Sequence, residues 1–155
     1  MATFAAQSVD AGDAVVIEVA STDDALTALG AAARNRLVNA AVIGITGSVG
    51  KTTTKDLLAA VLRRDRTTHA NLRSFNNEIG VPLTLLGAPD DSRAVVLEMG
   101  ARGVGHIATL CRTARPTVGI VTTVGKAHTS EFGSVEAVAL GKGELVESLP
   151  VEGFA

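Results

Sequence analysis

Residues 44–54 read Gly-Ile-Thr-Gly-Ser-Val-Gly-Lys-Thr-Thr-Thr, and the rest of the chain can be interpreted outward from them. An apolar run over residues 40–45 leads into this stretch, and a helical spacing of leucines and valines follows it. Gly47 and Gly50 lack a Cβ, so the backbone there can turn tightly and bring its N–H groups close to an anion. A strand, a glycine-rich turn, Lys-Thr and a helix in this order are typical of a phosphate-binding loop.

The residues of this loop have separate expected roles. The start of the helix presents unpaired N–H groups and the positive end of its dipole to a phosphate. Lys51 is expected to reach the outer phosphates of a nucleotide, and the Thr52 hydroxyl is expected to ligate Mg²⁺. The usual spacing, G-x-x-x-x-G-K-[ST], would place glycine where this chain has Ile45, so the loop is the shorter G-x-x-G-K-T. A plain glycine-rich turn is the alternative, but the surrounding strand and helix favour phosphate binding.

Length and composition narrow the class of protein. The 155 residues suit one domain of ordinary size, and 46% of them are hydrophobic, which is enough for a core. A net charge of −2, no Trp or Tyr and only four Phe argue against a nucleic-acid surface. No apolar run approaches the roughly 18–20 residues of a membrane helix, and the start does not resemble a signal peptide. The single cysteine, Cys111, predicts a reducing, cytoplasmic setting, and we expect it to be a buried structural thiol.

Apolar strands alternate with helices along the chain, whereas residues 1–14 carry no clear pattern. Strands are expected over residues 15–19, 40–45, 67–70, 93–99 and 117–124, and helices over residues 21–37, 51–64, 79–86, 103–112 and 134–149. This alternation predicts an α/β fold with a mostly parallel sheet and helices on both faces. Ligands of such sheets bind at the carboxyl ends of the strands, where the loop at 46–51, Glu98 and His128 all fall.

Glu98 and His128 are candidate metal ligands because of these positions. A carboxylate at the end of a neighbouring strand can hold the Mg²⁺ of a phosphate loop, although a solvated glutamate is the alternative for Glu98. The neutral imidazole of His128 is a candidate ligand beside such a site, although a lone histidine is more often a surface residue.

Lys142 lies in the apolar stripe of the last predicted helix, seven residues from both Val135 and Leu149. An unpaired ammonium is costly to bury, so a lysine at this position needs a specific role. A lysine with a lowered pKa is nucleophilic and can add carbon dioxide, and the resulting carbamate can bind metal. A lysine whose ammonium extends to the solvent-exposed rim is an equally good interpretation of the spacing.

Several strings of this sequence resemble the central domain of the Mur ligases, and the resemblance covers about residues 15–155. The strings lie at residues 46–53, 76–84, 97–103, 124–134 and 141–144. The phosphate loop is common to that whole family. Asn-Asn-Glu-Ile-Gly at residues 76–80 and Glu-Met-Gly-Ala-Arg-Gly at residues 98–103 resemble most the members that join D-alanyl-D-alanine to UDP-N-acetylmuramoyl-tripeptide.

The resemblance implies an ATP-dependent amide ligase of peptidoglycan precursor synthesis in the cytoplasm. In such a ligase the acceptor carboxylate attacks the γ-phosphate of ATP, and the amine of D-alanyl-D-alanine then attacks the acyl phosphate. The resemblance implies small-molecule substrates, no nucleic acid or membrane partner, and a monomer when full length. Another ligase of this type, such as a folylpolyglutamate synthase, and an inactive nucleotide-binding remnant are the alternatives.

The resemblance also assigns roles to individual residues. Lys51, Lys142 and His128 would be catalytic. Two Mg²⁺ ions would be held by Thr52, Glu98, His128 and Lys142, the last as a carbamylated lysine. The nucleotide would be bound by Gly47, Ser48, Val49, Gly50, Lys51, Thr52, Thr53, Asn76 and Asn77.

The chain departs from the family pattern at two positions and in extent. The family usually has Asn where this chain has Thr123 and Ala where it has Gly141, which puts the metal side of the site in doubt. By the resemblance, residues 1–38 are the tail of an N-terminal substrate-binding domain with a linker helix. Residues 39–155 are then a truncated central ATP-binding domain without a C-terminal domain. We therefore expect a fragment that is inactive by itself.

Overall fold

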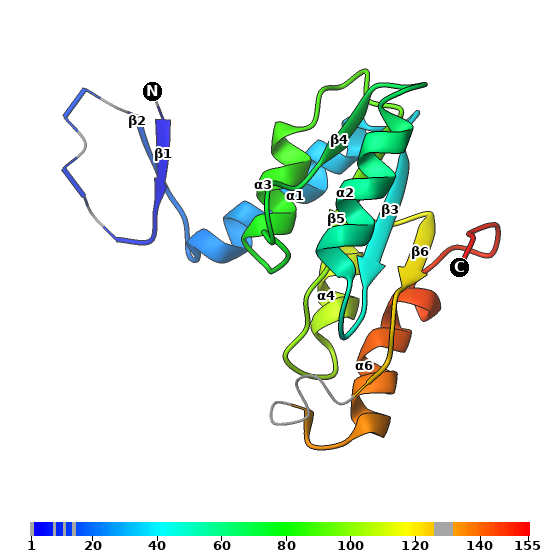
Figure 1. Ribbon diagram of the computed structural model, residues 1–155. Helices are drawn as coiled ribbons and strands as arrows, with labels where there is room; N and C mark the ends of the chain where they lie inside the picture. Colours follow the sequence, from blue (N-terminus) through cyan, green and yellow to red (C-terminus); the bar gives the residue numbers. More distant parts are fainter. Residues whose placement is uncertain (1, 8, 11, 14, 126–131) are drawn as a thin grey trace.

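The computed structural model describes residues 2–7, 9–10, 12–13, 15–125 and 132–155 (Figure 1). Its strands are β1 Ala2–Ala5, β2 Val15–Glu18, β3 Ala41–Thr46, β4 Thr68–Ala70, β5 Ala94–Glu98 and β6 Val118–Val121. Its helices are α1 Thr22–Arg36, α2 Lys51–Leu62, α3 Gly80–Gly87, α4 His106–Ala114 and α6 Val135–Glu147. None of the described helices has both the length and the apolar character needed to cross a membrane.

Four strands form the main sheet in the order β4-β5-β3-β6, and every neighbouring pair is parallel. The strand that leads into the glycine-rich loop, β3, is central and pairs with β5 on one side and β6 on the other. Ile45 lies opposite Glu98, so the carboxyl ends of β3 and β5 are adjacent. The mostly parallel α/β sheet predicted from the sequence is confirmed.

The two faces of the main sheet bury different sets of side chains, because successive strand residues point to opposite sides. Ile43 and Ile45 of β3 point to the face that α2 covers, where they pack with Ala59. Val42 points to the other face, which α1, α3, α4 and α6 cover, and joins the larger core. The prediction of helices on both faces is therefore confirmed (Figure 1).

Helix α6 lies close against the main sheet because two strands carry glycine beneath it. A Cβ added at Gly44 would lie 2.8 Å from a methyl carbon of Leu145, and one added at Gly119 would lie 3.2 Å from the same side chain. A serine caps each of α1 and α6: the N–H of Asp24 donates to Ser21 and that of Ala137 donates to Ser134. The predicted starts of both helices are confirmed.

The start of α4 is three residues later than the sequence predicted. Gly105 precedes the helix with a φ of 93°, a left-handed conformation that interrupts helical geometry. The carboxylate of Glu144 on α6 accepts hydrogen bonds from the N–H groups of Gly105 and Ala108 and so caps the helix. The prediction of a helix from residue 103 was wrong because this cap comes from a distant helix.

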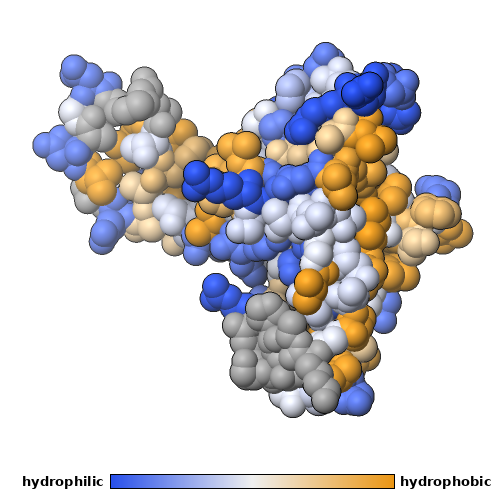
Figure 2. Space-filling view, in the orientation of Figure 1, coloured by the Kyte–Doolittle hydropathy of each residue, from blue (hydrophilic) through white to orange (hydrophobic). Residues whose placement is uncertain are grey.

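The first two strands form a separate small sheet, which lies apart from the main body in Figure 1. They are parallel, with Ala2 opposite Val15 and Ala5 opposite Glu18. No pattern in the sequence indicates β1. Val15, Val16 and Ile17 are exposed, and Figure 2 shows apolar surface on this sheet and beside α2, where Leu57 and Val61 are also exposed.

Candidate functional site

The glycine-rich loop turns sharply from β3 into α2 through two glycines with positive φ. Gly47 has a φ of 147° and Gly50, the residue that precedes α2, has a φ of 87°. A Cβ at Gly47 would collide with the hydroxyl of Thr122. Both positions therefore require glycine, which confirms the tight turn predicted from the sequence.

The segment after β6 holds the other side of the loop. The N–H of Ser48 donates to the carbonyl of Thr123 at 2.9 Å, and the N–H of Val49 donates to the Thr123 hydroxyl at 3.0 Å. The Ser48 hydroxyl both donates to and accepts from the backbone of Gly125. The threonine at position 123, where the Mur ligases usually have asparagine, thus fixes the shape of the loop in this chain.

Lys51 begins α2, and its side chain folds back over the loop. Its Nζ donates to the carbonyl of Gly47 at 2.8 Å and lines a cavity at the carboxyl end of the sheet. Thr52 follows it in the first turn of α2, and Thr53 is exposed on the same turn. A lysine held at the mouth of such a loop is placed to meet the phosphates of a bound nucleotide.

Glu98 is buried at the end of β5 and is held by two side chains. Its carboxylate accepts one hydrogen bond from the Thr52 hydroxyl and one from the Asn76 amide, both at 2.8 Å. Only 1% of the residue's surface is exposed, so the alternative of a solvated strand-end glutamate is wrong. Glu98 and Thr52 are brought together beside the loop, as the sequence predicted.

Lys55 is a second lysine of α2, and the sequence did not indicate its role. It is 1% exposed, and its Nζ donates to the carbonyls of Asn71 and Arg73 at 2.9 and 2.7 Å. It also pairs with Asp56 at 3.1 Å. These bonds join the main chain of the loop after β4 to the side chain of Lys55 on α2.

The same loop is fixed to β5 through Asn71. The Asn71 side chain accepts from the N–H of Glu98 at 2.9 Å and donates to the carbonyl of Phe75 at 2.9 Å. Lys55 and Asn71 together determine where residues 71–77 lie. They therefore position Asn76 against Glu98.

Asn76 and Asn77, which the sequence placed on the nucleotide or substrate side, both line the cavity. Asn76 packs on Gly100, where an added Cβ would lie 2.7 Å from its amide oxygen. The side chain of Asn77 accepts hydrogen bonds from the N–H groups of Ile79 and Gly80 at the start of α3. Direct contact of either residue with nucleotide stays a prediction.

Lys142 lies on the buried face of α6, as the apolar stripe predicted, with only 3% of its surface exposed. Its Nζ lies 5.5 Å from the ring centre of Phe132, and a Cβ at Gly141 would lie 2.6 Å from the same ring. Burial lowers the pKa of the Lys142 ammonium below its ordinary value, and the nearby charge of Lys51 lowers this pKa further. The alternative of a lysine extended to the rim is therefore wrong.

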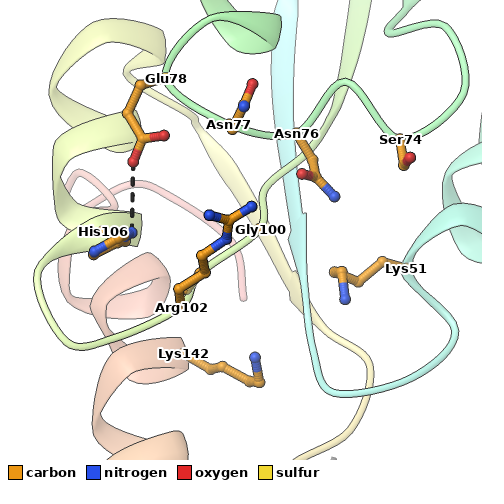
Figure 3. Close-up of a pocket in the computed structure, with 10 residues that line it drawn as sticks. Lys51, Ser74, Asn76, Asn77, Glu78, Gly100, Arg102, His106 and Lys142 are labelled. Atoms are coloured by element: carbon orange, nitrogen blue, oxygen red, sulfur yellow. Dashed lines mark ion pairs between the residues drawn. The ribbon is translucent and has the colours of Figure 1, made fainter. Parts of the chain in front are cut away.

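One cavity of about 500 Å³, shown in Figure 3, brings Lys51, Asn76, Asn77 and Lys142 together. Its lining comes from the start of α2, from the loops after β4 and β5, and from α4 and α6, namely Lys51, Ser74, Asn76, Asn77, Glu78, Gly100, Ala101, Arg102, His106 and Lys142. Four polar or ionisable lining side chains were not predicted: Ser74, Glu78, Arg102 and His106. Three of them follow strand ends, and the rule that ligands bind at the carboxyl ends of strands could have indicated them.

One predicted ligand of the metal site, His128, falls outside the part of the chain that the structure describes. Within the described part of the chain, no group of three or more His, Cys, Asp or Glu side chains could hold a metal ion. Glu98 with Thr52 is therefore the described pair best suited to a hard cation.

Comparison with known proteins agrees with this geometry. The model of the Mur ligase middle domain matches residues 45–155. Two curated relatives carry the name UDP-N-acetylmuramoyl-tripeptide–D-alanyl-D-alanine ligase. The one from Synechocystis is 49% identical over 114 residues, which are 74% of this chain and 25% of the relative. The one from Bacillus subtilis is 39% identical over 165 residues, which cover 97% of this chain and 36% of the relative.

Two solved structures have the same fold. The UDP-N-acetylmuramoylalanyl-D-glutamyl-2,6-diaminopimelate–D-alanyl-D-alanyl ligase of Acinetobacter baumannii matches with a TM-score of 0.88 and 31% identity, covering 97% of this chain and 33% of that one. The MurF ligase of Thermotoga maritima in complex with ADP matches with a TM-score of 0.81 and 36% identity. The match covers 94% of this chain and 34% of that one. This chain thus spans a quarter to about a third of the length of these relatives. The chain belongs to the Mur ligase family, and its residues 45–155 are a Mur ligase middle domain.

Proposed function

We propose that this chain is the ATP-binding part of a ligase that joins D-alanyl-D-alanine to UDP-N-acetylmuramoyl-tripeptide. The observation that carries the proposal is the meeting of Lys51, Thr52 and Glu98 at one edge of the sheet, beside a cavity that also receives Lys142. The names of the relatives supply the reaction. Such a reaction consumes ATP and a UDP-linked precursor, so we place the protein in the cytoplasm. The resemblance to the Mur ligases adds the proposal that the full-length protein is a monomer.

ATP is proposed to bind with its phosphates on the loop at residues 46–52. The left-handed turn at Gly50 directs the start of α2 toward this position, where its N–H groups favour an anion. Lys51 would exchange the Gly47 carbonyl for the outer phosphates. ADP in the Thermotoga maritima relative supports a nucleotide site in this fold.

Mg²⁺ is the metal that the residues beside the loop fit. The Thr52 hydroxyl and the Glu98 carboxylate are hard oxygen donors 2.8 Å apart, and Mg²⁺ usually combines one or two such groups with phosphate oxygens and water. When bound, Mg²⁺ would neutralise phosphate charge and orient the nucleotide. A second Mg²⁺ at His128 and Lys142 remains part of the proposal.

The proposed chemistry has two steps in the cavity. The acceptor carboxylate attacks the γ-phosphorus, a P–O bond to ADP breaks, and an acyl phosphate forms; the D-alanyl-D-alanine amine then attacks the acyl carbon, and inorganic phosphate leaves. Lys51 would stabilise the charge that develops on the transferred phosphoryl oxygens. Lys142 is proposed to be carbamylated, since its place against Phe132 shields the amine from water and burial lowers its pKa toward the neutral, nucleophilic form.

A chimaeric ligase tests the proposal. This chain replaces the segment that it matches in the Bacillus subtilis relative, and phosphate release is measured with ATP, the acceptor and D-alanyl-D-alanine. We expect release that requires all three substrates and that Lys51→Met abolishes. Arg64→Met, which removes an exposed cation just after α2, is the matched control and should leave release unchanged. Release that requires neither acceptor nor dipeptide would contradict the proposal.

A further inference from the structure

One rim of the cavity carries charged side chains that the ligase chemistry above does not use. Arg102, Glu78 and His106 lie on this rim, and Lys51 and Lys142 lie on the opposite one (Figure 3). Among the described residues, Arg102 makes no hydrogen bond and no ion pair. Glu78 has one contact with an ionisable side chain there, between its Oε1 and Nδ1 of His106 at 3.5 Å, which leaves Oε2 available.

We propose that Arg102 and Glu78 form a subsite for the far end of the acceptor's third residue, when that residue is 2,6-diaminopimelate. Arg102 binds its distal carboxylate and Glu78 binds its distal ammonium. The inference rests on the proposed function, since it concerns the acceptor of that reaction. The Acinetobacter baumannii relative is named for an acceptor with this third residue.

The chemistry of the ligand matches the rim. 2,6-Diaminopimelate has two amino-acid ends, of which one supplies the reacting carboxyl and the other is a free zwitterion. A guanidinium binds a carboxylate through two parallel hydrogen bonds, and a carboxylate binds an ammonium with charge assistance. One cation beside one anion is thus the complement of this free end, whereas a phosphate would be repelled by Glu78.

The backbone that carries the two side chains is held in place. Arg102 follows Gly100, against which Asn76 packs, so the loop after β5 rests on the loop after β4. The N–H of Gly100 donates to the carbonyl of Asn76 at 2.7 Å and fixes the same contact. Glu78 follows Asn77, whose side chain caps α3. Because the backbone of both residues is fixed, only their side chains lose freedom when they bind a zwitterion.

The rim lies where the side chain of the acceptor's third residue should extend when its carboxyl reacts. Lys51 and Lys142 mark the side on which the phosphoryl group and the reacting carboxyl meet. Figure 3 shows Arg102 directed into the space between that side and the Glu78–His106 pair. A third residue that reacts beside Lys51 therefore extends its side chain toward Arg102.

The subsite should distinguish acceptors by their third residue, because lysine lacks the distal carboxylate of 2,6-diaminopimelate. L-Lysine has a distal ammonium for Glu78 but nothing for Arg102. A lost charge-assisted pair reduces the specificity constant by about 10- to 100-fold. The subsite therefore predicts that an acceptor ending in 2,6-diaminopimelate is preferred over one ending in L-lysine by about that factor.

The test compares kcat/KM of the chimaeric ligase for two acceptors that differ only in this residue. We expect Arg102→Met to raise KM for the diaminopimelate acceptor by about 10-fold or more, with the lysine acceptor changed by less than about twofold. Glu78→Gln should weaken both acceptors, because both carry the ammonium. Arg112→Met, an exposed arginine of α4 outside this cavity, is the matched control.

Failure of the inference can be told from failure of the proposed function. If both acceptors turn over and Arg102→Met lowers kcat/KM equally for both, the subsite is wrong and the ligase function stands. If the parent chimaera does not discriminate between them, the subsite is also wrong. If the chimaera binds ATP but turns over neither acceptor, the proposed function fails, and the subsite fails with it.

Discussion

Replacement of Lys55 by methionine should destabilise this domain strongly, although Lys55 touches no predicted substrate. Methionine keeps an unbranched side chain of similar length and removes the ammonium. In the native chain that ammonium donates to the carbonyls of Asn71 and Arg73, in a site where Lys55 is 1% exposed. The variant therefore removes the donors that fasten the loop after β4 to α2.

The size of the stability loss follows from the carbonyl groups that the substitution leaves without a donor. The Asn71 carbonyl loses a donor in the buried interior, which costs about 1–3 kcal/mol. Arg73 is exposed, so its carbonyl can be hydrated and adds little, and the pair with the largely exposed Asp56 adds about 0–1 kcal/mol. We expect a loss of about 1–4 kcal/mol in the free energy of unfolding. At this chain length that corresponds to a fall of up to roughly 10 °C in Tm.

Urea unfolding followed by circular dichroism measures this loss, and Lys51→Met is the matched control. Lys51 lies four residues earlier on the same helix, is half-buried and has a single hydrogen bond to Gly47. We expect it to change stability by less than about 1 kcal/mol. A Lys55→Met variant within about 0.5 kcal/mol of the parent would refute the fastening role of Lys55.

Three further outcomes can be measured on the same chain. Burial raises the pKa of the Cys111 thiol to about 11, so the stability it contributes is complete below pH 9 and is lost as pH rises through 11. The free energy of unfolding of the parent chain should fall by about 2–3 kcal/mol relative to that of Cys111→Ala over that range. Parallel pH profiles of the two proteins would contradict this. Gly47→Ala should lower stability by roughly 1–3 kcal/mol in thermal melts because of its φ and its contact with Thr122, and an unchanged Tm would speak against it. Asn76→Ala should weaken Mg²⁺-dependent nucleotide binding more than Mg²⁺-free binding in calorimetry, since it frees one side of Glu98; equal weakening would argue that Asn76 acts elsewhere.

The sequence predicted most of the main sheet because its strands are continuous apolar runs with helices between them. Those patterns involve only neighbouring residues, so they can be recognised without knowledge of the fold. The loop at residues 46–52 and the positions of Glu98 and Lys142 followed in the same way, from strand ends and from a helical stripe. The strand β1 could not be predicted in this way, because its four residues lack a clear period. Its partner strand begins at Val15, thirteen residues after Ala2.

The rest of the site depended on contacts between distant segments. Glu78 faces the same cavity as Arg102 because Asn71 and Lys55 fix the loop after β4, and no short pattern encodes those hydrogen bonds. The start of α4 likewise depends on Glu144, which lies 36 residues beyond Ala108. Such tertiary hydrogen bonds override local propensity.

Binding of a Mg²⁺-bound, non-hydrolysable ATP analogue to the 155-residue chain tests the central claim most directly. Isothermal titration calorimetry should give one nucleotide per chain. Lys51→Met should weaken its affinity at least about tenfold, because a charged contact to phosphate is lost, and Arg64→Met should leave it unchanged. Equal affinity in all three proteins, or a folded chain that binds no nucleotide, would contradict the assignment of residues 46–52 as the phosphate site.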